Sequence, residues 1–154
     1  MSRMLSFLTI LSLLLTSTAC SAKKPLEPSA LKSKNVLSAL RALSASYEKK
    51  DLSAFLSDVS DGFRERETFA QSLTTVFAKY EAIQFNIQYT KMLIMIEEKG
   101  QIRTAFNWDA EWLAAGGAMQ KNGGRVTFAF DPGSFKLQSI DGKNPFVPVE
   151  KQQQ

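Results

Sequence analysis

The sequence predicts an α+β domain, in which three helices precede a four-stranded antiparallel sheet. Between residues 35 and 80, apolar residues recur every three or four positions, which is the spacing of amphipathic helices. From residue 83 onward, apolar and polar residues alternate, as in strands that bury one face and expose the other. A run of helices followed by a run of strands is typical of an α+β domain with the helices on one face of the sheet.

The three helices are predicted from their apolar faces and from one capping residue. The first begins near Ser33 or Asn35 and ends near Lys50. Asp51 is a residue type that often caps a helix, so a short second helix is expected to follow it. The third is expected from about residue 64 to Tyr80. The apolar positions are Val36, Leu40, Leu43, Tyr47, Leu52, Phe55, Leu56, Val59, Phe69, Leu73, Val76, Phe77 and Tyr80.

The strands are predicted from alternation and from the turn residues between them. Alternation is regular from Ile83 to Thr90, but residues 92–96 are continuously apolar, which indicates either a bulge or burial on both sides. The predicted segments are a strand over 83–96, a turn over 97–100, a strand over 102–112, a loop over 114–124, and strands over 126–130 and 135–140.

The first residues have the pattern of a secretory signal peptide. Arg3 makes the start positive, residues 5–15 carry no charge, and residues 16–19 are small. Eleven helical residues rise about 16 Å, well short of a hydrocarbon core of about 30 Å, so no permanent membrane span is expected here. The predicted organisation is a signal peptide over 1–19, a flexible tether over 20–33, one domain over 34–148 and a disordered tail over 149–154.

The single cysteine of the chain, Cys20, directly follows this signal. The stretch Ser17-Thr18-Ala19-Cys20 resembles a bacterial lipobox, although that pattern most often has leucine in place of Ser17. The resemblance implies that Cys20 becomes the first mature residue and that acyl chains on it hold the protein in a cell-envelope membrane. Ser21 then implies the outer membrane, facing the periplasm, if the host is Gram-negative. An ordinary secretory signal followed by an unpaired cysteine is the alternative.

The residues that the chain lacks exclude several kinds of chemistry. It has no histidine, and its one cysteine precedes the domain, so histidine bases, catalytic thiols and zinc sites are not expected. No phosphate-binding or dinucleotide-binding glycine motif is present, so neither a cofactor nor a metal is expected. The net charge of +4 comes from scattered basic residues interleaved with acids, so nucleic-acid binding is not expected either.

The domain from about Asn35 to Pro148 resembles the nuclear transport factor 2-like superfamily. The resemblance is carried by the stretches YEKKDL (47–52), SDGF (60–63) and SIDGKNPF (139–146). It implies a cone, in which three N-terminal helices pack on a curved four-stranded antiparallel sheet. That superfamily includes enzymes, receptors and scaffolds, so the resemblance implies a fold and leaves the activity open.

Carboxylates and aromatic side chains are the candidate functional residues that remain. Enzymes of the resembling superfamily often place an aspartate in the cone, and the nearest candidates are Asp58, Asp61 and Asp109. Asp58 is the weak catalytic candidate, because burial in a short helix would raise its pKa. All three are also explained as caps or solvated charges. The aromatic residues expected on the inner face either fill the core or line a pocket for a small apolar ligand: Tyr89, Phe106, Trp108, Trp112, Phe128 and Phe130.

These features favour a lipid-anchored envelope protein whose domain binds a small apolar ligand or a protein partner without catalysis. A carboxylate-dependent cyclase or isomerase is one alternative, and a structural component of an envelope complex is another. Membrane lipid is the partner expected at Cys20. A second copy of the chain is the other expected partner, through the open face of the sheet, where the polar and uncharged residues are Gln84, Asn86, Gln88 and Thr90.

Overall fold

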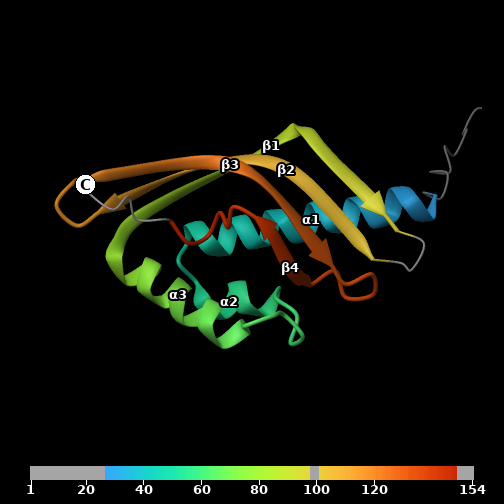
Figure 1. Cartoon of the computed structure of the whole chain (residues 1–154), viewed down its shortest axis with the longest axis horizontal. Coiled ribbons are helices and arrows are strands. Elements are labelled where there is room, and N and C mark those ends of the chain that lie inside the picture. The colour runs from blue at the N-terminus through green and yellow to red at the C-terminus, as the bar shows by residue number, and fades with distance from the viewer. Residues whose placement is uncertain (1–26, 98–100, 149–154) are drawn as a thin grey trace, which may run out of the picture.

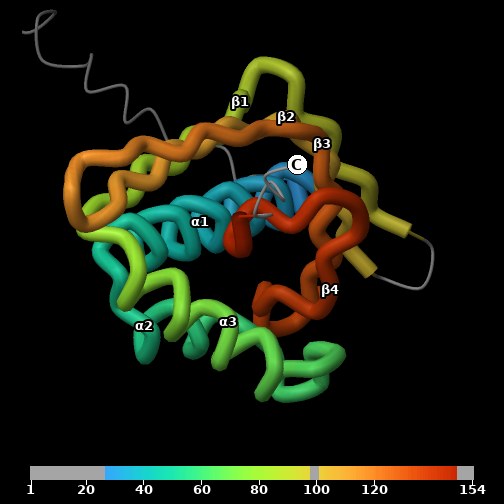
Figure 2. The backbone as a smooth tube through the Cα atoms, turned by 60° about the vertical axis from the view of Figure 1, so that its left-hand side comes forward, coloured from blue at the N-terminus to red at the C-terminus, as the bar shows by residue number. Residues whose placement is uncertain are grey.

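The computed structural model describes residues 27–97 and 101–148, and it has the predicted α+β architecture. Three helices lie against one face of a four-stranded antiparallel sheet of order β1-β2-β3-β4 (Figure 1). Figure 2 shows the sheet curving over the helices, with the chain that follows β4 running between the two layers. The predicted signal peptide with Cys20, the predicted tail and residues 98–100 of the predicted turn lie outside the described residues.

Helix α1 spans Pro28–Glu48, so it begins earlier than predicted. Proline is favoured at the first helical position, because its missing N–H needs no partner there and its fixed φ suits a helix. The prediction of a flexible tether over 20–33 is therefore wrong for residues 28–33, which are helical. The turns before Val36, the first buried residue of the helix, extend beyond the core.

The two remaining helices match their predictions closely. Helix α2 spans Leu52–Ser57, and the Asp51 carboxylate caps it by accepting a hydrogen bond from the Ala54 backbone N–H at 2.9 Å. Helix α3 spans Arg66–Lys79. Its buried residues are the predicted ones: Phe69, Leu73 and Val76.

Strand β1 spans Tyr80–Ile96 and contains the bulge that its sequence suggested. Gln88 pairs with Asn107 of β2 (Ile102–Ala114), whereas Leu93 pairs with Ala105, so residues 89–92 lie opposite Phe106 alone. The strand bends there (Figure 1). Because alternation stops at the bulge, Tyr89 is 42% exposed, and the prediction that it points into the cone is wrong.

Strands β3 (Met119–Phe130) and β4 (Leu137–Gly142) complete the sheet. The prediction of a loop over 114–124 is wrong, because residues 119–124 belong to β3 and only a short turn precedes them. Gly123 marks a close approach of two strands rather than a loop. A side-chain carbon placed on it would come within 2.9 Å of the Trp108 carbonyl oxygen.

Replacing Gly123 by alanine should therefore destabilise the domain. The added carbon pushes β3 away from a backbone atom of β2, which cannot rotate aside, and the expected loss is about 1–3 kcal/mol of unfolding free energy. Gly62→Ala is the control, because the nearest atom to its added carbon is the Ser60 hydroxyl at 3.8 Å. Urea denaturation measures both variants, and equal stabilities would refute this explanation of Gly123.

Candidate functional site: a filled cone and a cleft at its mouth

The interior of the cone is filled by aromatic rings gathered around Phe146. This residue follows the last strand, and the chain carries it back between the sheet and the helices, where it is fully buried. Its ring lies 4.8–6.4 Å, centroid to centroid, from five other rings, contributed by Tyr47, Phe55, Phe69, Phe85 and Phe128. Rings at these separations attract one another, so the cluster joins the three helices to two strands of the sheet, with Phe85 in the first strand and Phe128 in the third.

Four of the predicted pocket residues belong to this filled interior. Phe106, Trp108, Trp112 and Phe128 are at most 2% exposed, and Phe106 packs edge-to-face on Phe128 at 4.9 Å. Phe130 is also fully buried. None of them is among the residues that line the cleft described below.

Three buried polar groups of the cone, from Trp112, Tyr47 and Phe146, are joined in a short hydrogen-bond chain. The Trp112 indole N–H donates to the Tyr47 hydroxyl at 2.8 Å, and that hydroxyl donates to the Phe146 carbonyl oxygen at 2.8 Å. Burial raises the pKa of Tyr47 well above its ordinary value of 10, so the phenol stays protonated. The Trp112 N–H and the Tyr47 hydroxyl therefore stabilise the ring cluster around Phe146, which we call the plug, and are not free to orient a ligand. In the described part of the chain, the Trp108 indole N–H and the Thr104 hydroxyl are buried without a hydrogen-bond partner.

The three aspartates named from the sequence are not brought together. Asp58 ends α2, where burial raises the pKa of its carboxyl and the Lys136 charge opposes that rise. Asp61 is exposed and lies 3.8 Å from Arg66. Asp109 lies on the outer face of the sheet, where the Asn86 amide donates to it at 3.1 Å. None of the three lines the cleft, and no tyrosine does.

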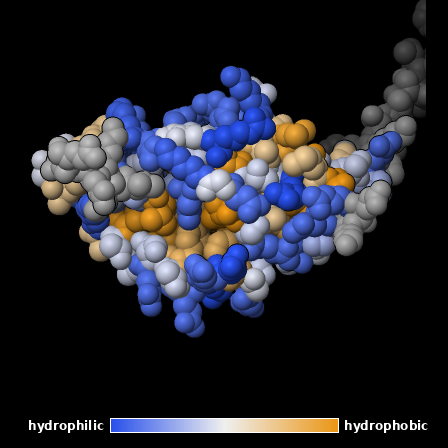
Figure 3. Space-filling view, in the orientation of Figure 1, coloured by the Kyte–Doolittle hydropathy of each residue, from blue (hydrophilic) through white to orange (hydrophobic). Residues whose placement is uncertain are grey.

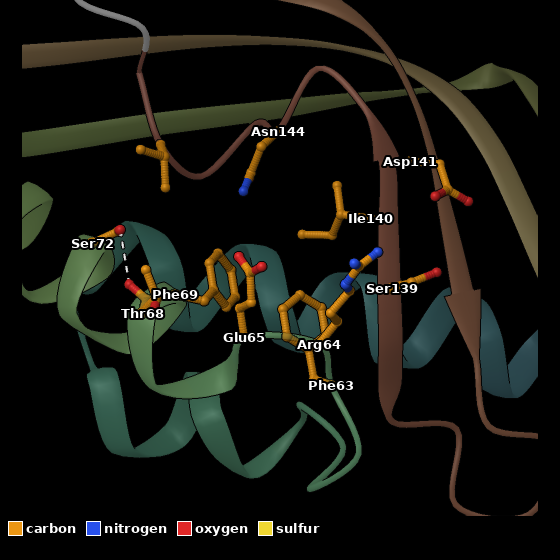
Figure 4. A pocket seen from close by; sticks show the side chains of 11 residues that line it. Phe63, Arg64, Glu65, Thr68, Phe69, Ser72, Ser139, Ile140, Asp141 and Asn144 are labelled. Atoms are coloured by element: carbon orange, nitrogen blue, oxygen red, sulfur yellow. Dashed lines mark hydrogen bonds between the residues drawn. The ribbon is translucent and has the colours of Figure 1, made fainter.

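The cleft lies at the mouth of the cone, between the start of α3 and the chain around β4. Its volume is about 650 Å³. Figure 4 shows Phe63, Arg64 and Glu65 on one side and Ile140 and Asn144 across from them. In Figure 3, apolar residues are visible in a hollow on the face of the molecule that carries the cleft. The full lining is Phe63, Arg64, Glu65, Thr68, Phe69, Ser72, Ser139, Ile140, Asp141, Asn144 and Val147.

The cleft combines apolar walls with a few polar groups that can orient a ligand. Phe63 stacks on Phe69 at 5.0 Å and forms one wall. Glu65 precedes α3 with φ of 57°, a left-handed conformation that is uncommon outside glycine and that is often found at functional sites. The Asn144 side chain accepts a hydrogen bond from the Phe146 N–H, which ties the cleft wall to the plug. Within the described residues, no three His, Cys, Asp or Glu side chains are placed where they could hold a metal ion together.

Sequence reasoning did not select these cleft residues, although a signal for them existed. Two of the stretches that carry the family resemblance, 60–63 and 139–146, lie at opposite walls of the cleft. In the sequence these stretches indicate only the fold, through the family resemblance. The polar residues within these two stretches are the sequence signal that could have indicated a site.

Comparison with known proteins identifies the fold. Neither protein-family models nor curated proteins match the chain. Among solved structures it is similar to a nuclear transport factor 2-like superfamily protein from Salmonella enterica serovar Typhimurium, with 12% identity, coverage of 76% of this chain and 93% of that chain, and a TM-score of 0.62. PrhC from Penicillium brasilianum has 11% identity, coverage of 71% and 79%, and a TM-score of 0.60. The pinacolase BvnE from Penicillium brevicompactum has 10% identity, coverage of 70% and 84%, and a TM-score of 0.57. The described domain therefore has the nuclear transport factor 2-like α+β cone fold.

Proposed function

We propose that this chain is a lipid-anchored cell-envelope protein whose domain binds a small, largely apolar molecule in the cleft, without catalysis. The observation that carries the proposal is the filled cone: the space where cone enzymes hold their substrates is occupied by Phe146 and its ring neighbours. The cleft at the mouth supplies apolar walls and a few polar groups, the composition typical of small-molecule sites. An apolar side chain of a protein partner is the other occupant that this chemistry suits.

A carboxylate-dependent cyclase or isomerase is the second candidate. Burial raises the pKa of the Asp58 carboxyl, which is the direction that suits a carboxyl acting in proton transfer. The similarity to a pinacolase supports only the shared fold, because the identity is 10%. Asp58 lies outside the cleft lining and has no tyrosine across a pocket from it, so binding is the better-supported function.

A blocked cleft tests the binding proposal. Ser72 lines the cleft on α3, and its hydroxyl bonds back to the Thr68 carbonyl oxygen; Thr75, on the exposed side of the same helix, makes the same kind of bond to Gln71. Ser72→Trp should reduce the amount of co-purifying small molecule at least about tenfold, whereas Thr75→Trp should not. Native mass spectrometry of the purified protein measures both. Equal occupancy in the two variants would place the ligand elsewhere.

The anchor is tested separately at Cys20. Among the described residues, no helix is long and apolar enough to cross a membrane. Cys20→Ser should release the protein from the membrane fraction and remove the acyl mass from its amino terminus, because an oxygen in place of the thiol does not accept the lipid. Cell fractionation and intact-mass measurement check this. A Cys20→Ser protein that still sediments with membranes would contradict the anchor.

Pairing of two copies through the open sheet face stays a prediction. Gln84, Asn86 and Thr90 are exposed there, as such a contact requires, and Gln88 is half-buried. Sedimentation of the purified protein that shows monomers alone at micromolar concentration would count against it.

A further inference from the structure

One end of the molecule carries an exposed apolar surface that neither the core nor the cleft uses. Beyond the bulge, Leu93 and Met95 of β1 pair with Ala105 and Arg103, on the face of the sheet opposite the helices. Figure 3 shows hydrophobic residues gathered over this outer half of β1. The apolar patch consists of Leu93 and Met95 on this outer face, which are 51% and 38% exposed, together with two exposed neighbours at the same end of β1. Ile96, 39% exposed, pairs with Ile102 on the other face, and Tyr89, 42% exposed, lies in the bulge with the Arg41 guanidinium 5.9 Å from its ring. Exposed apolar side chains gathered at one end of a strand mark contact surfaces.

The start of α1 lies at the same end of the molecule as this patch. Figure 1 shows the N-terminal end of α1 and the end of β1 at one extreme of the long axis, with the β2–β3 turn at the other. The first turns of α1 precede the core, and Leu31 on them is 48% exposed. Apolar side chains from two separate elements are thus exposed at the end where the chain enters the domain.

The length of the tether determines which end stays near the membrane. Seven residues, 21–27, separate Cys20 from the start of α1 at Pro28. Fully extended, they span at most about 25 Å, which is less than the ~31 Å length of the 21-residue helix itself. A lipid on Cys20 therefore keeps the end with the apolar patch close to the bilayer, while the end with Met119 can lie far from it.

We propose that the apolar patch docks on the same bilayer that holds the anchor, so that the domain lies on the membrane in one orientation. The inference rests on the lipid anchor proposed above. The bulge serves this contact by turning Leu93 and Met95 outward. Tyr89 adds an aromatic ring with a polar tip, a side chain suited to the interface between headgroups and acyl chains. The charged residues at this end are Lys32, Lys34, Arg41 and Lys91 against Glu27 and Glu97, so a small positive excess adds to the apolar contact on an anionic bilayer.

A matched pair of methionines provides the test. Met95 lies in the patch, and Met119, which is 54% exposed, lies at the β2–β3 end of the molecule. Met95→Cys and Met119→Cys are made in the full chain, where the sulfur of Cys20 carries lipid and does not react. Each introduced thiol receives a nitroxide spin label, and the lipidated proteins are placed on vesicles of phosphatidylethanolamine with a minority of phosphatidylglycerol. Sedimentation of the vesicles first establishes that the protein is anchored.

The label at position 95 should become about fivefold less accessible to a water-soluble nickel relaxation agent on vesicles and more accessible to oxygen, which concentrates in the bilayer. The label at position 119 should stay accessible to the nickel reagent. Adding Leu93→Gln to the Met95→Cys protein should restore accessibility while the protein still sediments with vesicles.

Two outcomes would overturn the docking and leave the anchor intact. In the first, the protein sediments with vesicles but the labels at 95 and 119 are equally exposed to water. In the second, protection at 95 rises with the density of protein on the vesicles, which would assign the patch to a second copy of this chain. A protein that fails to sediment would instead refute the anchor on which the docking depends.

Discussion

Replacing Phe146 by alanine lowers the unfolding free energy by about 3–5 kcal/mol, the cost of removing a large buried side chain from a site that cannot collapse around the gap. The ring touches five others that belong to all three helices and to the sheet, so no single element can move to fill the space. Urea denaturation at neutral pH measures the loss.

Phe63→Ala is the matched control for this prediction. Phe63 is half-buried at the rim of the cleft and stacks on Phe69, and its loss should cost less than about 2 kcal/mol. If the two variants are equally stable, Phe146 does not hold the cone together, and the account of the interior as a packed cluster fails.

Tyr47→Phe lowers the unfolding free energy by about 2–4 kcal/mol, although it removes only the hydroxyl group. The Tyr47 hydroxyl is the acceptor for the Trp112 N–H and the donor to the Phe146 carbonyl oxygen, so its removal leaves two buried polar groups without partners. Tyr89→Phe makes the same chemical change at an exposed tyrosine and should alter stability by less than about 0.5 kcal/mol. Equal effects at the two positions would contradict the role given to the hydrogen-bond chain.

The Tyr47 effect has a defined dependence on pH. Because burial raises the pKa of Tyr47 above its ordinary value of 10, the folded protein keeps the phenolic proton where the unfolded chain has lost it. The stability that Tyr47 contributes is therefore complete below pH 10 and is lost as the pH rises beyond that value. From pH 6 to pH 9, the difference in unfolding free energy between the wild type and Tyr47→Phe should be constant within a measurement error of about 0.5 kcal/mol. Above pH 10, this difference should shrink. A difference that grows at alkaline pH would show that the hydroxyl is not buried.

Most of the fold could be predicted because its signals are local. The apolar spacing of α1 and α3, the Asp51 cap and the alternation before Gln88 depend on near neighbours in the sequence. The errors occur where a residue type serves two purposes. Pro28 lies in the predicted tether but begins a helix, because proline also suits the first helical position. Gly123 lies in the predicted loop but permits two strands to approach closely.

The candidate site was harder to predict, because it depends on contacts between distant segments. The sequence predicted that Trp108 and Phe128 lie inside, but whether they line a pocket or fill a core depends on Phe146, which returns from beyond the last strand. The position of Tyr89 depends on the bulge, whose exact place the continuous apolar run does not specify. The cleft itself joins residues 63–72 to residues 139–147, a contact that no local pattern reports.

Xenon binding measured by nuclear magnetic resonance tests most directly whether the cone is filled. Xenon enters empty apolar cavities and shifts the signals of the groups around them. In the wild-type protein, methyl and ring signals near Trp108, Phe128 and Leu137 should not move as the xenon pressure rises, whereas in Phe146→Ala they should shift and saturate. Saturable shifts at these residues in the wild type would show an open cone and would favour the enzyme hypothesis over binding without catalysis.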